Sequence, residues 1–279
     1  MKNNSGCKAS LIISIYKNCV FLKAVLDSLP FQTEQNFEII ISEDGNDPKV
    51  KRFIDNYPFQ NPHKHLVQED LGWRKNRALN RAILAASAEQ LIFIDGDCIL
   101  HPRFIEIHTT YFQQDRILAG WRVFLNEEQS TQVLKSTQHI QKIQFIIWKA
   151  LIKSDGIKRP EEGIFCSPTG FMAFIPKLRK LDYLTGCNMS FSKTAIMSIN
   201  GFDEDYDKPA YGEDTDLVWR FKMAGYKFYS LRNLAVQYHL NHPRSWTDQS
   251  ENMNKGMTKQ QRKEYICKLG IALHLQRQK

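Results

Sequence analysis

The first 113 residues repeat one pattern four times: an apolar run of strand length, a polar turn and an amphipathic stretch. The four runs are residues 9–16, 37–45, 64–70 and 89–98. After the first run, Leu22, Val25 and Leu29 recur at a spacing of three and four, which indicates a helix. Strands that alternate with helices form mostly parallel sheets whose faces the helices cover. We therefore expect an α/β protein with a single Rossmann-like, mixed but mostly parallel sheet flanked by helices.

The chain beyond residue 113 follows this pattern less regularly. Residues 118–125 predict a strand, 131–154 one long amphipathic helix, and 159–176 a mobile loop. The remaining pattern predicts a short strand and a helix in 184–206, a helix with an acidic start in 211–231, and a last strand in 234–244. The basic tail, residues 246–279, predicts a helix that either lies on anionic lipid or packs on the sheet.

Charge and composition restrict the partners and the compartment. The formal net charge of +8 favours anionic partners such as nucleotides or an anionic membrane face. The six cysteines form no CxxC pair, so we expect reduced thiols rather than a zinc site or a disulfide framework. We see neither a signal-peptide pattern nor an apolar run near the ~18 residues of a membrane-spanning helix. The expected location is the cytoplasm, with the inner face of the membrane as an option.

Acidic residues follow the predicted strands where ligands bind in such sheets, beyond the carboxyl ends. The second run ends in "SEDGND" and the fourth in "DGDC", so Asp44, Asp95 and Asp97 are expected to share one crevice. Two carboxylates on a tight turn suit Mg²⁺ or Mn²⁺, ions that also hold phosphates. Gly96 between them would let a diphosphate approach the backbone. The alternative for this turn is an acidic loop exposed to water.

Two histidines near the end of the last predicted strand are further metal-ligand candidates. His239 and His242 in "HLNH" would lie on one rim, and imidazole beside carboxylate suits Mn²⁺ better than Mg²⁺. The alternative is a pair of surface histidines. Arg74 and Lys75 open a predicted helix beside the crevice and could meet phosphate, unless they only form its solvated face.

A third acidic group begins the predicted helix in 211–231. Glu213 and Asp214 lie at the positive end of the helix dipole, which should keep both carboxylates ionised at pH 7. An ionised carboxylate is available as a general base. Capping of the helix is the alternative, and we expect Asp216 to do only that.

Taken together, the chain resembles the family 2 glycosyltransferases with a GT-A fold, joined to a β-1,4-galactosyltransferase-type C-terminal region. The resemblance extends from "SIYKN" to the last histidine pair and rests on six segments in order: "SEDGND", "EDLGWRKNRALNRAI", "FIDGDCILHP", "LTGCNMSFSK", "GFDEDYDKPAYGEDTDLVWR" and "HLNHPR". It implies an inverting, metal-dependent hexosyltransferase that moves a sugar from a UDP-sugar to a hydroxyl. The implied acceptor is a glycan or a lipid-linked saccharide, in the biosynthesis of a surface polysaccharide such as LPS or capsule.

The resemblance also implies roles for single residues. Asp97 and His242 would bind the metal, with His239 as a third ligand and Mn²⁺ preferred to Mg²⁺. Asp214 would be the base and Glu213 would orient a sugar. The residues expected to bind the donor are Ile15, Tyr16, Asp44, Arg74, Lys75, Asp95, Gly96, Gly186 and Asn188.

The same resemblance divides the chain. Residues 1–245 would form the glycosyltransferase domain, with a nucleotide-sugar half in 1–113 and an acceptor half in 114–245, followed by the tail. Two positions depart from the family pattern. Glu43 stands where the family often has an aspartate, and 126–180 matches nothing in it, so we expect acceptor choice to depend on that segment.

Two rival functions fit the sequence less well. A nucleotidyltransferase usually carries a glycine-rich loop with a basic residue after its first strand, and "SIYKNCVFL" lacks one. A basic nucleic-acid-binding protein would show clustered Lys and Arg with exposed aromatics. The basic residues here are dispersed, so we expect no nucleic-acid partner.

Overall fold

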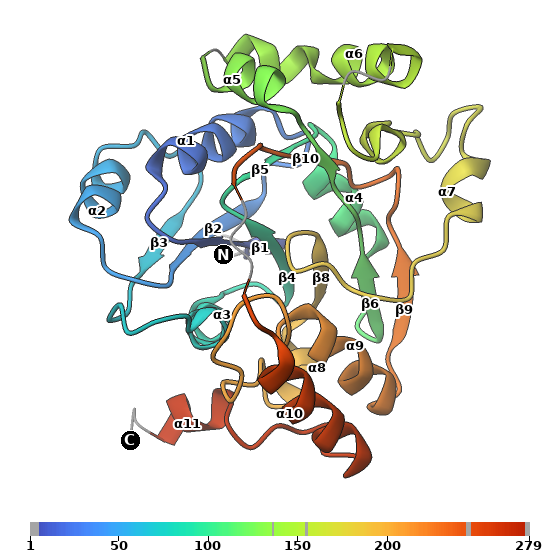
Figure 1. Cartoon of the computed structure of the whole chain (residues 1–279). Helices are drawn as coiled ribbons and strands as arrows, with labels where there is room; N and C mark the ends of the chain where they lie inside the picture. The colour runs from blue at the N-terminus through green and yellow to red at the C-terminus, as the bar shows by residue number, and fades with distance from the viewer. Residues whose placement is uncertain (1–5, 136, 154–155, 244–246, 277–279) are drawn as a thin grey trace, which may run out of the picture.

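The computed structural model describes residues 6–135, 137–153, 156–243 and 247–276. Its centre is a seven-stranded sheet with helices on both faces (Figure 1). In spatial order the strands are β3 His63–Leu66, β2 Phe37–Glu43, β1 Ala9–Ile15, β4 Gln90–Asp95, β8 Met189–Ser192, β6 Arg116–Ala119 and β9 Lys227–Ser230. Within this sheet, β8 runs antiparallel to both of its neighbours and the other pairs are parallel. The predicted mixed, mostly parallel α/β sheet is confirmed.

The sheet is the middle layer of three. One face is covered by α1 Cys19–Ser28, α2 Pro48–Asp55 and α4 Phe104–Tyr111, with the short 3-10 helix η1 Leu29–Phe31 after α1. The other is covered by α3 Lys75–Ala85, α8 Lys193–Ser198 and α9 Asp214–Met223. Alternate side chains of β1 serve the two layers, because successive residues of a strand point to opposite faces: Leu11 and Ile13 pack on one side and Ile12 on the other.

A second sheet of three short strands was not predicted. It consists of β5 Cys98–Leu100, β10 Gln237–His239 and β7 Val123–Phe124, with β10 in the middle. The strand predicted over 118–125 is in fact two strands in different sheets, β6 and β7. The chain turns between them at Gly120, whose N–H donates to the Asn188 carbonyl oxygen at 2.8 Å. A Cβ at Gly120 would collide with the Asn188 side chain.

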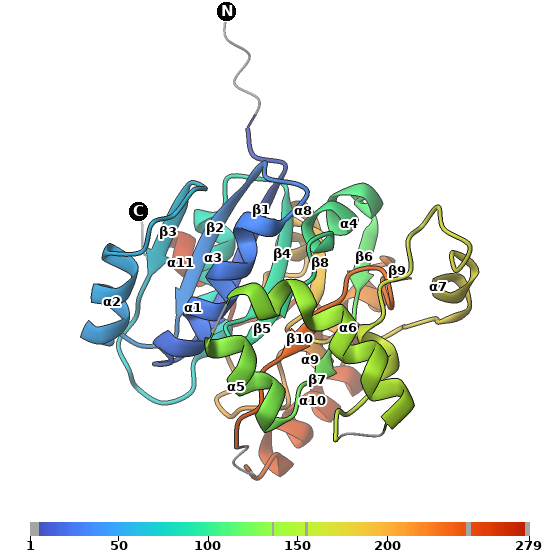
Figure 2. The ribbon, with the colours of Figure 1, turned by 90° about the horizontal axis from the view of Figure 1, so that it is seen from above.

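Residues 126–180 differ from the predicted pattern in two places. The single helix expected over 131–154 is two helices, α5 Glu127–Lys135 and α6 Thr137–Lys153, which pack on the small sheet (Figure 2). The expected mobile loop contains a 3-10 helix, η2 Pro160–Gly163, and the start of α7 Phe174–Leu178. The carboxylate of Glu162 is buried and pairs with Arg179 and Arg232, which fixes η2 to the body.

The tail forms two separate helices, α10 Ser250–Gln261 and α11 Ile271–Gln276, rather than one continuous helix. Ile271 and Cys267 are buried, and the Ile271 N–H donates to the Asn200 carbonyl oxygen at 3.0 Å. This part of the tail therefore packs on the helices of the sheet, the second of the two expected alternatives. Among the described residues, every helix is too short or too polar to cross a membrane.

The parallel strands β1, β2 and β4 are in register, so their carboxyl ends meet at one edge of the sheet. β1 begins at the opposite edge (Figure 2). The turns after these three strands carry the acidic residues that the sequence singled out.

Candidate active site

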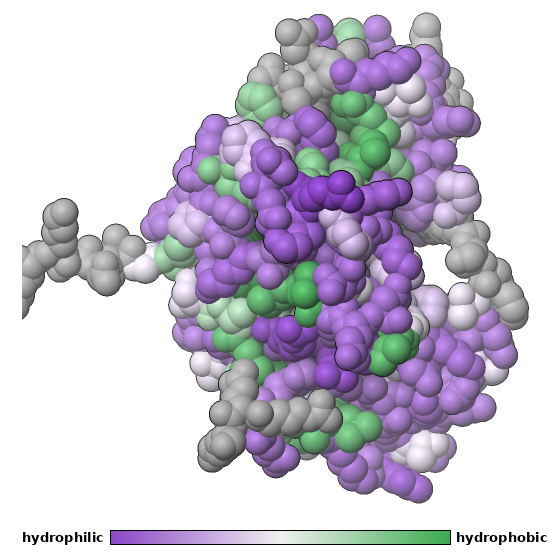
Figure 3. Space-filling view, turned by 90° about the vertical axis from the view of Figure 1, so that its left-hand side faces the viewer, coloured by the Kyte–Doolittle hydropathy of each residue, from purple (hydrophilic) through white to green (hydrophobic). Residues whose placement is uncertain are grey.

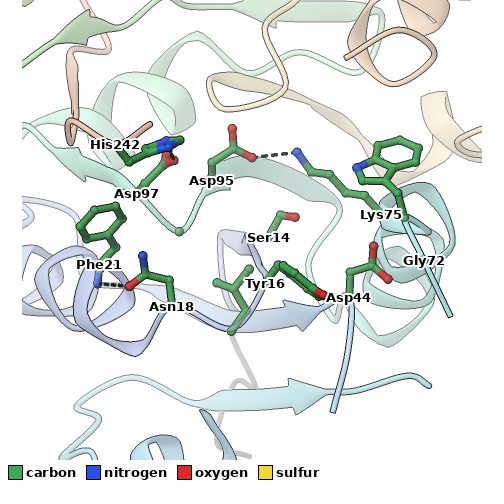
Figure 4. Close-up of a pocket in the computed structure, with 13 residues that line it drawn as sticks. Ser14, Tyr16, Asn18, Phe21, Asp44, Gly72, Lys75, Asp95, Asp97 and His242 are labelled. Carbon is green, nitrogen blue, oxygen red and sulfur yellow. Dashed lines mark hydrogen bonds and ion pairs between the residues drawn. The ribbon is translucent and has the colours of Figure 1, made fainter. Parts of the chain in front are cut away.

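A cavity of about 560 Å³ lies at the carboxyl ends of β1, β2 and β4 (Figure 4). Eight of the expected site residues line it: Ile15, Tyr16, Asp44, Lys75, Asp95, Gly96, Asp97 and His242. The cavity is large enough for a nucleotide-sized ligand. The expectation that Asp44, Asp95 and Asp97 share a crevice is therefore confirmed.

The turn between β4 and β5 presents its two carboxylates to different partners. Asp95 ends β4, and its carboxylate lies 2.8 Å from the Lys75 ammonium. Asp97 lies just before β5 and faces the histidines. Gly96 between them donates its N–H to the Ser14 carbonyl oxygen at 2.8 Å, and a Cβ there would lie 2.5 Å from the Ile15 side chain. A glycine at this position is thus required for close contact with β1, whatever ligand binds.

Asp97, His239 and His242 form one cluster. The Asp97 Oδ2 lies 3.0 Å from His242 Nε2 and 3.4 Å from His239 Nε2, and the two imidazole rings stack 5.1 Å apart. All three side chains can direct a ligand atom to one point, since these atoms lie within 4.8 Å of one another. Burial opposes ionisation of Asp97, but the His242 hydrogen bond and the His239 charge lower its pKa to about 2. Two imidazoles and one ionised carboxylate fit a divalent transition-metal ion.

A second acidic cluster lies at the start of α9. Lys75 connects it to the β4 turn, because its ammonium contacts Asp95 and Glu213 at 2.8 Å each. Asp214 accepts hydrogen bonds from the N–H of Gly186 at 2.9 Å and of Thr215 at 2.7 Å. A Cβ at Gly186 would lie 2.3 Å from Glu213 Oε1. Gly186 was expected to bind the donor, but its contacts here are with the two carboxylates.

These surroundings change the proton affinity of both carboxylates. Burial, together with the charges of Asp95 and Asp214, raises the pKa of Glu213 to about 7 despite the nearby Lys75. Burial also raises the pKa of Asp214. The expectation that the helix dipole alone would keep both ionised is therefore wrong for Glu213, because desolvation outweighs the dipole.

Asp216, expected only to cap α9, has a different role. Its carboxylate is buried, lies 2.9 Å from the Arg220 guanidinium and accepts from the Tyr206 hydroxyl and the Trp219 indole. Gly225 closes the helix with a positive φ of 84°.

Three other residues act differently from the expectation. The Arg74 guanidinium points to the Glu69 carbonyl, and the Arg74 backbone N–H donates to Asp44 at 2.7 Å, so Arg74 shapes the pocket through its backbone. Glu43 is buried against His65 at 2.8 Å. Asn188 is completely buried, so the donor contact expected of it does not fit this position.

The Asn188 side chain instead joins three segments that are distant from it in the sequence. Its amide donates to the carbonyls of Trp121 and Ala235, and its Oδ1 lies 3.1 Å from His108 Nε2. Burial lowers the pKa of His108 to about 3, so the imidazole is neutral within this network. Asn188 thus supports the segment that carries Gly186.

Five lining residues were missed by the sequence reading: Ser14, Asn18, Phe21, Gly72 and Trp73. One signal was available for Asn18, because asparagine before a helical pattern is a preferred N-cap, and its side chain accepts from the Phe21 N–H at 3.0 Å. For Trp73 the signal was an aromatic side chain directly before the helix that carries Lys75. The remaining three are recognisable only once the chain is folded.

Fold and site together define a class of protein: an α/β protein whose ligand site, lined by carboxylates and imidazole, lies at the carboxyl edge of a mostly parallel sheet. The family model for glycosyl transferase family 2 matches residues 10–181. A second model, for the N-terminal domain of galactosyltransferase, matches residues 171–243. The chain belongs to glycosyl transferase family 2.

Several known proteins are similar to this chain. Validoxylamine A glucosyltransferase of Streptomyces hygroscopicus subsp. jinggangensis is 30% identical over 99 residues, which are 35% of this chain and 24% of the relative. Hyaluronan synthase of Pasteurella multocida is 20% identical over 265 residues, 89% of this chain and 26% of the relative. The chain thus matches about a quarter of the length of these two relatives.

Solved structures share the fold at low sequence identity. A mannosyltransferase from Pyrobaculum calidifontis, in complex with GDP-Man and Mn²⁺, matches with a TM-score of 0.57 and 13% identity, over 92% of this chain and 65% of that chain. The expected GT-A fold is confirmed.

Proposed function

We propose that the protein is an inverting, metal-dependent glycosyltransferase that moves a sugar from a UDP-sugar to a hydroxyl of a glycan or lipid-linked saccharide. One observation carries the proposal: Lys75 joins the Asp95–Asp97 turn to the Glu213–Asp214 pair. One site therefore contains both a cluster of side chains that could hold a cation and a candidate base. A transferase needs both functions within reach of one substrate. Membership in family 2 supports the same reaction class.

The sugar donor would bind in the cavity and at the Asp97 cluster beside it. Asp97, His239 and His242 would hold a divalent cation, Mn²⁺ in preference to Mg²⁺, and such an ion supplies positive charge that offsets the charge of a leaving diphosphate. Asp44 is held in place by Gln68 and the Arg74 N–H and borders the cavity, where it would accept hydrogen bonds from the nucleoside. Tyr16 would contact the base or ribose from the end of β1.

The acceptor hydroxyl would react at the start of α9. Asp214 would take the proton of the acceptor hydroxyl while its oxygen bonds to the anomeric carbon and the bond from that carbon to the diphosphate oxygen breaks. Attack from the face opposite the leaving group inverts the anomeric carbon and requires no covalent sugar–enzyme intermediate. The Gly186 and Thr215 N–H groups orient the Asp214 carboxylate. Glu213, held by Lys75, would position a sugar hydroxyl.

The setting we propose is the synthesis of a surface polysaccharide, such as LPS or capsule, in the cytoplasm at the inner face of the membrane. Similarity to a hyaluronan synthase over most of the chain supports a polysaccharide product. In this proposal residues 1–113 bind the donor and residues 114–245 bind the acceptor.

A nucleotide-release screen tests the function. The purified protein is incubated with each UDP-sugar and each GDP-sugar, with saccharide acceptors, with Mn²⁺ and after exhaustive EDTA treatment. We expect UDP release from one UDP-sugar that depends on Mn²⁺. Full activity after EDTA would contradict the metal dependence, and release of GDP alone would contradict the donor. Formation of pyrophosphate from UTP and a sugar phosphate would support a nucleotidyltransferase instead.

A further inference from the structure

Helix α7 and the turn before it expose three large apolar side chains. Phe171 lies in the turn before α7, and Phe174 and Leu178, four residues apart, lie on one side of the helix. Phe171 is 90% exposed and Leu178 is 75% exposed. Pro176 is the buried residue of α7, and a cavity of about 630 Å³ separates the helix from β9. The segment therefore contributes little to the core, which leaves these side chains without a structural role inside the protein.

Helix α6 exposes a second apolar pair on the same side of the molecule. Its inner residues Ile143 and Ile147 pack in the core of the small sheet, while Phe145, 62% exposed, and Trp148 face outward. The link from α6 to α7 runs through η2, which is fixed to α6 because the Gln144 amide donates to the Gly163 carbonyl oxygen at 2.7 Å. Figure 1 shows α6 at the top of the molecule and α7 at the side opposite α2, and in Figure 2 both helices lie on the side away from α2.

Lysines accompany both apolar groups. Lys142 and Lys149 are exposed on α6, and the Lys149 ammonium lies 4.4 Å from the centre of the Phe145 ring. Lys177 and Lys180 are exposed on and after α7. Within the part of the chain that the structure describes, none of these four forms a salt bridge, whereas Lys51 and Lys208 on other surfaces do. Their positive charge is therefore available to an anionic partner.

The side that carries α2 and β3 provides a contrast. It is mostly hydrophilic, with small separate apolar areas (Figure 3). Phe145, Phe171, Phe174 and Leu178, by contrast, are each more than half exposed on α6, α7 and the turn before α7. Large exposed apolar side chains that gather on one part of a surface mark a place where another molecule or a membrane binds.

We propose that the α6–α7 surface, formed by Phe145, Trp148, Phe171, Phe174, Leu178 and the four lysines, docks on an anionic phospholipid membrane. The aromatic rings and Leu178 would enter the headgroup region, and the lysines would contact lipid phosphates. The matched charge and the aromatic composition favour this occupant over a second copy of the chain, whose same surface would bring lysines against lysines. The proposal rests on the proposed function for its purpose, which is to bring the site to a lipid-linked acceptor.

This surface replaces the tail as the expected membrane contact. The tail also exposes apolar residues, Ile266, Leu269 and Leu275, but Ile271 between them is buried against the body. The tail therefore offers no continuous apolar face. It supplies instead a matched control of three comparably apolar, exposed positions.

Vesicle flotation tests the proposal with the full-length protein. Vesicles of phosphatidylcholine alone are compared with equimolar phosphatidylcholine and phosphatidylglycerol, for the wild type, for Phe171→Ser/Phe174→Ser/Leu178→Ser, and for the control Ile266→Ser/Leu269→Ser/Leu275→Ser. We expect the wild type to float with the anionic vesicles, the α7 variant to bind them at least about tenfold more weakly, and the tail variant to bind as the wild type does. Lys177→Gln/Lys180→Gln should lose the preference for anionic lipid while keeping the melting temperature of the wild type.

Four outcomes would overturn the proposal: no flotation of the wild type, equal flotation of the α7 variant, loss of flotation in the tail variant, or a wild-type dimer in sedimentation that the α7 variant converts to monomer. Binding of UDP with Mn²⁺ separates this result from the proposed function. The α7 variant should retain it, since none of its positions lines the cavity proposed for the donor. Lipid binding that persists in a protein without transferase activity would refute the function and leave the docking surface standing.

Discussion

Two acidic clusters border the same site, and the pKa values of their carboxylates are shifted in opposite directions. In the first, Asp97 faces two imidazoles, and its pKa is lowered to about 2. In the second, Glu213 shares the Lys75 ammonium with Asp95, and burial and the neighbouring carboxylates raise its pKa to about 7. Both carboxylates are largely withdrawn from water. The number of cationic or hydrogen-bond-donating groups around each carboxylate, rather than burial alone, therefore decides its charge state.

The two charge states suit two different chemical roles, metal binding and proton exchange. A carboxylate with a very low pKa stays ionised at every physiological pH, which a metal ligand requires. A carboxylate with a pKa near neutrality can gain or lose a proton during a reaction, which is useful next to a base. The predictions below change one cluster and use the other as the reference.

The largest effect is expected from Asp214→Asn. If Asp214 is the base, kcat and kcat/KM should fall together by ~10²–10⁴-fold, with the affinity for UDP unchanged. Glu213→Gln should mainly raise KM, because Glu213 positions a substrate group. The measurement is steady-state nucleotide release with the donor and acceptor that the screen identifies. An almost normal kcat in Asp214→Asn beside an inactive Glu213→Gln would reverse the two roles.

A smaller effect is expected from Lys75→Met, which removes the cation shared by Asp95 and Glu213. We expect a loss of about 3 kcal/mol in the free energy of unfolding at pH 7.5, because two largely buried carboxylates lose their shared counter-charge. Adding Glu213→Gln should restore part of it, since one of the two charges is then gone.

Lys51→Met is the matched control for this change. Lys51 pairs with Asp55 on an exposed helix face, so its loss should cost less than about 1 kcal/mol. Urea unfolding measures all four proteins. Equal losses for Lys75→Met and Lys51→Met would show that Lys75 does not join the two clusters.

The smallest effect is the pH dependence that Glu213 imposes on stability. A carboxyl whose pKa rises from 4.5 to about 7 on folding favours the folded state below pH 4.5, and this contribution is lost as the pH rises through 7. Between pH 5 and pH 8, the wild type should therefore lose roughly 2 kcal/mol relative to Glu213→Gln. Unfolding titrations of both proteins across this range measure the difference. Parallel curves would place the pKa of Glu213 at its ordinary value.

The parts of the molecule that sequence reasoning found are those determined by local pattern. The strands of the large sheet and the helices up to residue 113 follow from apolar spacing, and the meeting of Asp44, Asp95 and Asp97 follows from the shared edge of parallel strands. His239 and His242 were identified from their place beside a strand end and now lie next to Asp97. In each case a residue's position along its own element was sufficient.

What could not be predicted depends on contacts between distant segments. The division of 118–125 into β6 and β7 is set by the approach of Asn188 to Gly120, and the bridging position of Lys75 depends on where α9 begins. The burial of Asn188 follows from its packing against His108. None of these contacts produces a periodic pattern in the sequence. The raised pKa of Glu213 depends on such contacts, so it could not be predicted either.

Mn²⁺ binding is the most direct test of the central claim, that the Asp97 cluster binds the metal ion and that Asp214 acts separately as the base. Electron paramagnetic resonance of free Mn²⁺, titrated with protein in the presence of UDP, measures the affinity of the wild type, Asp97→Asn and Asp214→Asn. We expect Asp214→Asn to bind Mn²⁺ as the wild type does and Asp97→Asn to bind it at least about tenfold more weakly. Wild-type affinity in Asp97→Asn, or a comparable loss in Asp214→Asn, would contradict the central claim.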